Sequence, residues 1–302
     1  MNVQDADHYP QLTLLTVKGW QDYELLDSGN GKKLERFGVY RLVRPEAEAI
    51  WQPSLPEREW KLAHAVFHPS QEEMGGHWEV MRDLPSRWVM EYEGLRFYVQ
   101  TTASRHVGVF PEQASQWDWL MGQIRSCGRP LRVLNLFGYT GLATLAAARA
   151  GAQVTHVDAS PKVVGWARDN QGLSGLGGAK IRWIVDDALK FVRREYRRGV
   201  FYDGLILDPP KFGRGPKGEV WEFYKLIPEL LEACAQILSP EPQFVWMTAY
   251  SVKASSLTLY NAVLEKMKRW RGTIAAGEVV LAEKSAGRLL AMSIFASWSA
   301  AR

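Results

Sequence analysis

The feature that most constrains the fold is a regular alternation of short apolar runs with longer amphipathic runs from Leu131 to the end of the chain. The short runs have the length of strands, and the longer ones have apolar residues at helical spacing. Strands that alternate with helices predict right-handed βαβ crossovers and a parallel sheet with helices on both faces. The last two strand-like runs, residues 274–283 and 287–298, have no helix between them, so we expect the sheet to close with an antiparallel hairpin.

The first hundred residues have a different pattern. From Leu12 to about Thr102, short β-rich runs are separated by turn signals such as DSGNG at 27–31 and HPSQEEMGG at 68–76. This pattern predicts a small, mostly antiparallel β domain. A helix between the two halves should begin near Pro111 and stop before Gly128. We therefore expect an N-terminal mainly-β domain over residues 1–110 and an α/β domain over 111–302.

Composition limits the partners and the compartment. A net charge of +4 and a pI near 9.0 fit a polyanionic partner such as RNA, because Lys and Arg displace counterions from phosphates. Cys127 and Cys234 have no CxxC partner, which disfavours a disulfide framework and a zinc or other metal site and fits a reducing cytoplasm. The opening MNVQDADHYP lacks the features of a secretory leader, and no run of about 18 apolar residues predicts a membrane span.

The first strand of the alternating half ends in a glycine turn, FGYTG at 137–141. Gly138 and Gly141 allow a ligand to approach the backbone, and the following helix offers free N–H groups. The second strand ends in Asp158, twenty residues after Gly138, where a carboxylate can bind ribose hydroxyls. Leu136 interrupts the GxGxxG pattern of dinucleotide sites, which favours S-adenosylmethionine, a cofactor without phosphate. The alternative is that these glycines only permit packing.

The third strand ends in IVDDA. Asp187, or its neighbour Asp186, is a candidate acceptor for an adenine amino group, and a plain helix N-cap is the alternative for either residue. Ala188, which follows them, and Ser160, which follows Asp158 closely, complete the expected cofactor contacts on these two strands.

The fourth strand ends in LDPPKFGRGPKG, residues 207–218. Ligands of open parallel sheets bind at the carboxyl ends of the strands, so Asp208 should lie at the mouth of the site. Pro209 and Pro210 fix two φ angles and leave the carbonyls of Asp208 and Pro209 to accept the hydrogens of an amino group. Phe212, beside Lys211, could stack on an attached ring, which contributes about 1–3 kcal/mol. The alternative is an ordinary Asp-Pro turn with Phe212 in the core.

Together NLFGYTGLAT, THVDAS, VDDALKFV and LDPPKFGRG resemble class I S-adenosylmethionine-dependent methyltransferases. More narrowly, they are similar to the bacterial ribosomal RNA large-subunit methyltransferases that carry DPPKF. The resemblance covers roughly residues 90–302 and implies a Rossmann-like, seven-stranded, mostly parallel sheet. It also implies cofactor roles: Asp158 for the ribose, Asp187 for the adenine, Gln113 from the linker, and Asn135, Phe137, Tyr139 and Thr140 for the methionine portion.

Some members of that family methylate carbon 5 of cytosine and need a cysteine thiolate, which follows their fifth strand. Here the segment reads FVWMTAYSVKAS and has no cysteine, while Cys234 lies in an apolar helical pattern. A ring or exocyclic nitrogen, served by Asp208 and Pro209, is therefore the predicted acceptor.

Two basic sets and one histidine remain. Lys190, Arg193, Arg194, Arg197 and Arg198 share one helix face, for which a solvated surface is the commoner explanation. The basic set in the loop after Asp208 is better placed for a substrate; it consists of Lys211, Arg214 and Lys217. His106 precedes the linker, where a structural role is more common than a place in the site.

The leading hypothesis is a methyltransferase that acts on a nucleobase nitrogen of ribosomal RNA. The alternatives are a methyltransferase of small molecules or proteins, a nucleotide-binding dehydrogenase, and a non-catalytic RNA-binding protein that retains the cofactor fold.

Overall fold

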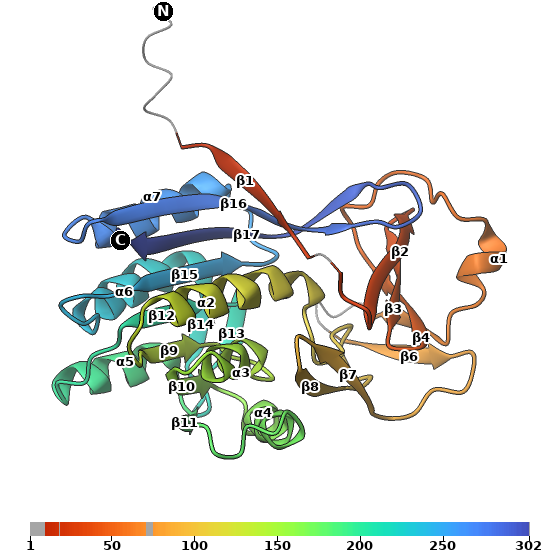
Figure 1. Cartoon of the computed structure of the whole chain (residues 1–302). Helices are drawn as coiled ribbons and strands as arrows, with labels where there is room; N and C mark the ends of the chain where they lie inside the picture. The colour runs from red at the N-terminus through yellow and green to blue at the C-terminus, as the bar shows by residue number, and fades with distance from the viewer. Residues whose placement is uncertain (1–9, 18, 71–74, 302) are drawn as a thin grey trace, which may run out of the picture.

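The computed structural model describes residues 10–17, 19–70 and 75–301. Its largest element is an eight-stranded sheet with the strand order β1-β16-β17-β15-β12-β9-β10-β11 (Figure 1). Strands β15, β12, β9, β10 and β11 are mutually parallel, and β17 is antiparallel to both of its neighbours. The strands of this sheet are β1 (Leu12–Thr16), β9 (Arg132–Leu136), β10 (Gln153–Asp158), β11 (Ile181–Val185), β12 (Gly204–Leu207), β15 (Phe244–Ala249), β16 (Gly272–Ala282) and β17 (Leu289–Ala300).

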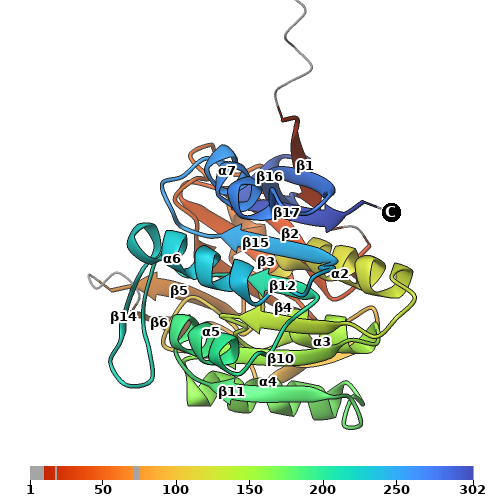
Figure 2. The ribbon, with the colours of Figure 1, turned by 90° about the vertical axis from the view of Figure 1, so that its left-hand side faces the viewer.

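Helices cover both faces of this sheet (Figure 2). One face is packed by α5 (Ala188–Arg197), α6 (Phe223–Gln236) and α7 (Ser256–Met267), whose buried side chains include Phe191, Leu230 and Val263. The opposite face carries α2 (Ala114–Ser126), α3 (Leu142–Arg149) and α4 (Pro161–Leu173). A sheet covered on both sides explains why its strands are nearly continuous apolar runs.

The expected α/β class is confirmed, including the antiparallel hairpin at the carboxyl end. The sheet has one strand more than the seven expected, because β1 pairs in parallel with β16. Residues 12–16, which the expected division assigns to the N-terminal domain, therefore lie in the large sheet. Strand β17 pairs with one edge of the long strand β16. Strand β1 pairs with residues 276–280 on the other edge, where the backbone N–H and C=O groups would otherwise have no strand partner.

The N-terminal region forms a second, five-stranded sheet beside the carboxyl ends of the parallel strands (Figure 1). It confirms the expected mainly-β character, although β4 and β5 pair in parallel. This region contains β2 (Tyr23–Gly29), β3 (Lys32–Phe37), β4 (Tyr40–Pro45), α1 (Glu57–Trp60), β5 (Ala65–Pro69), β6 (Gly76–Val80) and the hairpin of β7 (Trp88–Tyr92) and β8 (Leu95–Val99). The DSGNG signal forms the β2–β3 turn. Residues 71–74 of HPSQEEMGG, and residues 1–9, lie outside the described residues.

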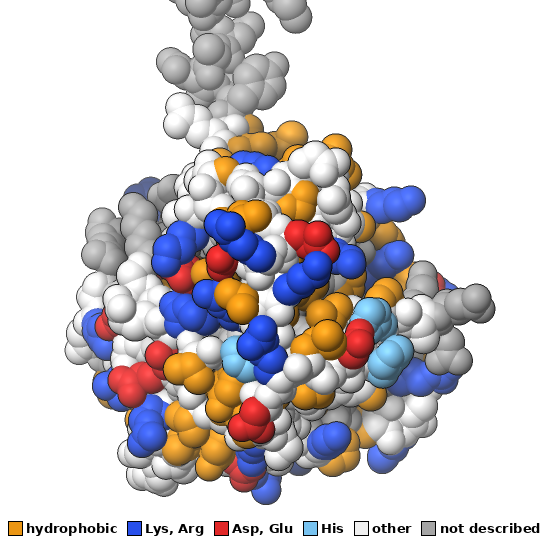
Figure 3. All heavy atoms as spheres, turned by 90° about the vertical axis from the view of Figure 1, so that its right-hand side faces the viewer, with side chains coloured by type: hydrophobic (Ala, Val, Ile, Leu, Met, Phe, Trp, Pro, Cys, Tyr) orange, Lys and Arg blue, Asp and Glu red, His pale blue; other side chains and the backbone are white. Residues whose placement is uncertain are grey.

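Lys and Arg side chains gather near the centre of the face that this region presents, with acidic side chains among them (Figure 3). No helix in the described part of the chain is long and apolar enough to cross a membrane.

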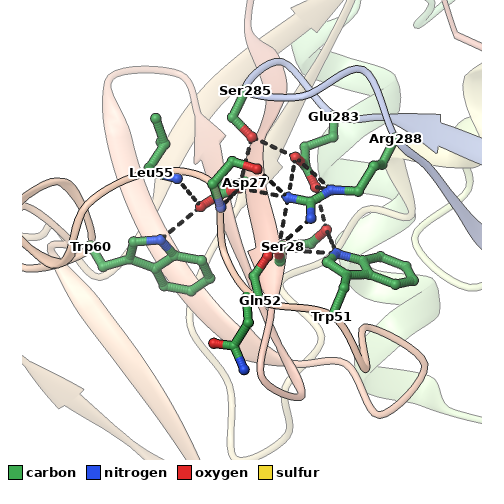
Figure 4. Close-up of polar contacts among 10 residues, drawn as sticks. Asp27, Ser28, Trp51, Gln52, Leu55, Trp60, Glu283, Ser285 and Arg288 are labelled. Carbon is green, nitrogen blue, oxygen red and sulfur yellow. Dashed lines mark hydrogen bonds and ion pairs between the residues drawn. The ribbon is translucent and has the colours of Figure 1, made fainter.

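The tip of the β16–β17 hairpin, residues 283–288, anchors the N-terminal sheet (Figure 4). Arg288 contacts the carboxylate of Glu283 at 2.7 Å and that of Asp27 at 3.3 Å. Ser28 donates to Glu283, and Ser285 donates to Asp27 at 2.7 Å. Because Asp27 and Glu283 are buried, the guanidinium compensates two carboxylates that would otherwise lie uncompensated between the two sheets.

Candidate active site

The carboxyl ends of the parallel strands meet at one edge of the sheet. Asn135 lies opposite His156 on β10 and Ile206 on β12, and Leu207 lies opposite Met247 on β15. The residues that follow these strands are therefore neighbours, and Asp186 N donates to Asp158 O at 3.2 Å beside them. The edge brings together the glycine turn and the acidic residues predicted from the sequence.

The glycine turn has strained backbone geometry. Phe137 and Tyr139 have φ of 58° and 50°, a region that costs non-glycine residues roughly 1–2 kcal/mol each. Gly141, with φ of 85°, is the N-cap of α3. Gly138 donates to the carbonyl of Val157 at 3.1 Å, and any Cβ at Gly138 would lie 2.3 Å from His156 Cε1. The turn is thus pressed against β10, with its backbone at the sheet edge.

Asp158 fastens this turn and keeps acceptor capacity. Its Oδ2 accepts from Tyr139 N at 3.0 Å, and its Oδ1 accepts from Ser160 N at 2.9 Å. Burial raises the pKa of this carboxyl despite these backbone hydrogen bonds. A carboxylate has about four lone-pair positions, so at least one acceptor position remains for a ribose hydroxyl. Ser160 itself caps α4 by accepting from Val163 N.

The acidic pair after β11 has structural contacts of its own. Asp187 is the N-cap of α5 and accepts from Lys190 N at 2.9 Å, which is the alternative that the sequence left open. Asp186 accepts from Asp187 N and forms a 2.6 Å ion pair with Arg194. Ala188 is buried in the first turn of the helix. An adenine contact at Asp187 or Asp186 stays a prediction.

Asn135 and Thr140 support the turn from behind. The buried amide of Asn135 donates to Thr144 Oγ1 at 2.9 Å, and Thr144 in turn contacts His156 Nδ1 at 2.9 Å. Thr140 donates to the carbonyl of Gly108 at 2.6 Å. These polar side chains form hydrogen bonds within the protein. Their contact with the methionine portion of the cofactor stays a prediction.

Gln113 supplies an observation that fits a bound cofactor. Its side chain is buried, and its Oε1 has no hydrogen-bond partner among the described residues. A buried acceptor without a donor costs about 1–3 kcal/mol, so a ligand amino group is a reasonable occupant. With Asp158 and the turn backbone at the sheet edge, this acceptor makes the residues fit S-adenosylmethionine, which carries amino and hydroxyl groups but no phosphate.

Asp208 lies beyond the last ladder pair of β12. Thr248 at the end of β15 donates to its Oδ1 at 2.6 Å, and burial raises the pKa of the carboxyl in spite of that bond. Pro209 is buried behind it. The sheet pairs of β12 end at Leu207, so Asp208 and Pro209 lie beyond the ladder, and their role as acceptors of an amino group stays a prediction.

The basic loop after Asp208 is a short hairpin, β13 (Phe212–Arg214) and β14 (Val220–Glu222). Trp221 fastens it, because its indole donates to Pro210 O at 2.6 Å and its ring lies 4.8 Å from that of Phe137. The ring of Phe212 is 51% exposed, with Lys211 Nζ 5.1 Å from its centroid. The core alternative for Phe212 is therefore wrong, and the ring is accessible to a ligand.

The two basic sets differ in their pairing. Four members of the α5 stripe have carboxylate partners within 4.0 Å; the pairs are Lys190–Glu219, Arg193–Glu229, Arg194–Asp186 and Arg198–Glu195. None of Lys211, Arg214 and Lys217 forms an ion pair with any other described residue. All three cations of the hairpin, but only Arg197 of the helix set, therefore lack a carboxylate partner among the described residues.

Sequence reasoning missed an aromatic cluster that joins this edge to the linker. The ring of Phe110 lies 5.3 Å from Tyr139, 6.1 Å from Tyr250 and 4.9 Å from His106. Burial lowers the pKa of His106 to about 3, which makes it a neutral ring of the cluster. Tyr250 directly follows β15, so the rule that ligands bind where parallel strands end could have identified it.

Neither cysteine lies in this cluster. Cys127 is the C-cap of α2, and Cys234 is buried in α6, where burial raises the pKa of its thiol. Among the described residues, no three His, Cys, Asp or Glu side chains are arranged to hold a metal ion.

The chain is similar to known methyltransferases. Residues 59–242 match a family described as S-adenosylmethionine-dependent methyltransferase. The crystal structure of the SAM dependent methyltransferase from Agrobacterium tumefaciens is 47% identical and has a TM-score of 0.90, and the match covers 96% of each chain. The structure of SMU.776 complexed with SAH has a TM-score of 0.71 over 92% of this chain and 75% of that one; at 17% identity it shows the fold alone.

A curated relative is the "Ribosomal RNA large subunit methyltransferase K/L" of Shewanella baltica strain OS155, 34% identical over 155 residues. That match covers 51% of this chain and 21% of the relative, so the chain spans about a fifth of the length of the curated relatives it matches. The predicted resemblance to that family is confirmed. The match over more than half of the chain, together with a site whose residues fit the cofactor, shows that this protein belongs to the S-adenosylmethionine-dependent methyltransferases and uses S-adenosylmethionine as its cofactor.

Proposed function

We propose that this protein methylates a nitrogen of a nucleobase in ribosomal RNA, in the cytoplasm. The observation that carries the proposal is the exposed ring of Phe212, four residues from the Asp208 carboxylate, at the edge that holds the cofactor residues. The name of the Shewanella relatives supports RNA as the substrate class.

The cofactor supplies an electrophilic methyl group bound to a sulfonium. The residues of the chain orient the acceptor. The carboxylate of Asp208 and the carbonyl of Pro209 accept the hydrogens of an amino group, which directs its lone pair away from them. Phe212 stacks on the base, and this interaction contributes about 1–3 kcal/mol. When the nitrogen forms its new bond it must lose a proton, and burial makes Asp208 a better proton acceptor by raising its pKa.

The absence of a nearby thiol supports nitrogen over carbon 5. The segment after β15 carries Tyr250 and Ser251 where a cysteine nucleophile would be needed, and Cys234 is buried in a helix core. Carbon-5 methylation requires a thiolate that adds to the ring.

The test is transfer of a labelled methyl group to ribosomal RNA from cells that lack the gene, followed by mass spectrometry of the nucleosides. We expect one methylated nucleoside that the substrate RNA lacks and that Asp208→Ala and Phe212→Ala fail to produce. Label found only in protein or in extract metabolites would overturn RNA as the substrate. Absence of label from every acceptor would favour the non-catalytic alternative.

A further inference from the structure

We propose that the pocket between the N-terminal sheet and the carboxyl edge of the large sheet binds a phosphate of the substrate nucleic acid, with Arg105 as its principal ligand. This proposal rests on the proposed function, because it names how the RNA backbone is held beside the reacting base. The pocket is lined by side chains from four parts of the fold, among them Lys33, Arg44, Arg105, Phe110, Glu112 and Tyr250.

The pocket borders the reaction site. Tyr250 is two residues after Thr248, which holds Asp208, and Phe110 lies 5.3 Å from Tyr139 in the glycine turn. One aromatic ring therefore separates the pocket from the cofactor residues. A group bound in the pocket would lie against Phe110 and Tyr250, the rings that join it to the glycine turn and to the end of β15.

The charges favour an anion. Arg44 is matched by the bidentate contacts of Glu35 at 2.7 Å, and Lys33 is matched by Glu46 at 3.1 Å. Arg105 forms no ion pair with any other described residue; it donates to the hydroxyl of Tyr250 and lies 5.5 Å from the centroid of that ring. A planar guanidinium without a carboxylate partner is the group best suited to a phosphate.

Glu112 should make the affinity of this pocket for an anion depend on pH. Burial is the main cause that raises the pKa of its carboxyl to about 7, while Lys33 and Arg44 act to lower it and Glu35 to raise it. The other charged or titratable groups of the pocket are Arg105, Glu46, Tyr250 and His106, and burial keeps His106 neutral above pH 3 or so. Below pH 7 Glu112 is mostly neutral and the pocket has an excess positive charge. Above pH 7 its carboxylate cancels that charge, so anion affinity should fall as the pH rises from 6 to 8.

The experiment measures binding of a tetramethylrhodamine-labelled single-stranded RNA decamer by anisotropy, with S-adenosylhomocysteine present. Phosphodiesters do not titrate between pH 6 and 8, so the probe adds no pH dependence of its own. We expect Arg105→Gln to weaken binding about 10-fold or more, the loss of one charge-assisted contact, and to reduce the salt slope by about 0.7. Arg105→Lys should restore most of the salt slope. The matched control is Arg197→Gln, an exposed arginine of α5 remote from the pocket, which should bind like wild type.

Glu112→Gln should abolish the pH dependence between pH 6 and 8 while keeping the affinity seen at pH 6. Thermal melting followed by circular dichroism confirms that each variant is folded, without relying on any ligand.

Adenosine 5′-monophosphate is a second probe that separates this proposal from the proposed function. If wild type binds the mononucleotide through Arg105 but binds no RNA, the anion subsite stands and RNA as the substrate is overturned. If RNA binds equally well to wild type and Arg105→Gln at every salt concentration, the subsite is overturned and RNA methylation is unaffected. If neither probe binds wild type, the subsite is overturned.

Discussion

Thr248 at the end of β15 donates its hydroxyl hydrogen to Asp208 after β12, across 2.6 Å. The bond joins two adjacent parallel strands at the edge where the cofactor residues lie, and it stabilises a buried carboxylate in its charged form. Burial nevertheless raises the pKa of Asp208 above the usual 3.8. The charged carboxylate, which can accept a hydrogen bond, therefore lowers the stability of the folded protein.

Asp208→Asn should separate activity from stability. The amide oxygen can still accept from Thr248, but a neutral amide cannot take the proton of the amine, so we expect methyl transfer to fall roughly 100-fold. Because the folded pKa of Asp208 is raised, its charge opposes folding at neutral pH, and the neutral variant should melt at the same temperature or higher. Rate assays and thermal melts check both; a variant that loses stability and activity together would contradict this role.

Phe212→Ala should weaken substrate use without affecting folding. The ring is 51% exposed, so its removal leaves no cavity, while the loss of stacking at about 1–3 kcal/mol corresponds to roughly 5- to 150-fold in kcat/KM. Phe201→Ala, at a ring that is 42% exposed at the start of the segment leading to β12, is the matched control. Equal kinetic effects of the two variants would show that Phe212 does not contact the substrate.

Gly138→Ala should impair cofactor binding and stability together. Its Cβ would lie 2.3 Å from His156 Cε1, and the buried ring is held by Thr144, so the turn must move. Overpacking of this kind costs about 1–3 kcal/mol. Gly178→Ala, where a Cβ meets no atom within 4 Å, is the control and should be neutral. Chemical unfolding and calorimetric titration with S-adenosylmethionine measure the two effects; unchanged cofactor affinity in Gly138→Ala would argue against the turn as the binding site.

Arg288→Gln should destabilise the contact between the two sheets. The change leaves the buried carboxylates of Asp27 and Glu283 without their cation, at a cost on the order of 3 kcal/mol. Arg271→Gln, at an exposed site before β16, should stay within about 0.5 kcal/mol of wild type in urea unfolding. Similar midpoints for the two variants would mean that the cluster contributes little.

The contacts of Asp27 in the same cluster predict that the stability of the fold decreases in acid. Burial acts to raise the pKa of Asp27, but hydrogen bonds from Ser285, Leu55, Trp60 and Ser54 lower it below its usual 3.8 overall. A folded pKa below the unfolded value gives stability that is present above about pH 3.8 and lost as the pH falls through the folded value. The pH dependence of the unfolding free energy should therefore be shallower in Asp27→Asn than in wild type below pH 4. Parallel curves would show that the charge of Asp27 does not stabilise the fold.

The architecture of the alternating half of the molecule could be predicted from local sequence patterns. Apolar runs bounded by turns and amphipathic helices can satisfy their backbones only in a parallel sheet covered on both faces. Once the sheet is parallel, the residues after each strand must meet at one edge. Gly138, Asp158 and Asp208 could therefore be placed together from local patterns, and the motifs around them resemble one family.

Contacts between segments far apart in the chain could not be predicted in this way. β1 joins β16 across most of the chain, and Arg288 reaches Asp27 from 261 residues away. The pocket that combines Lys33 and Arg105 with Tyr250 exists only once the two sheets are docked. Local periodicity carries no information on such contacts, because any edge strand can pair with another strand and any buried charge can pair with an opposite charge. Only the packing of the whole chain determines which strand and which charge become partners.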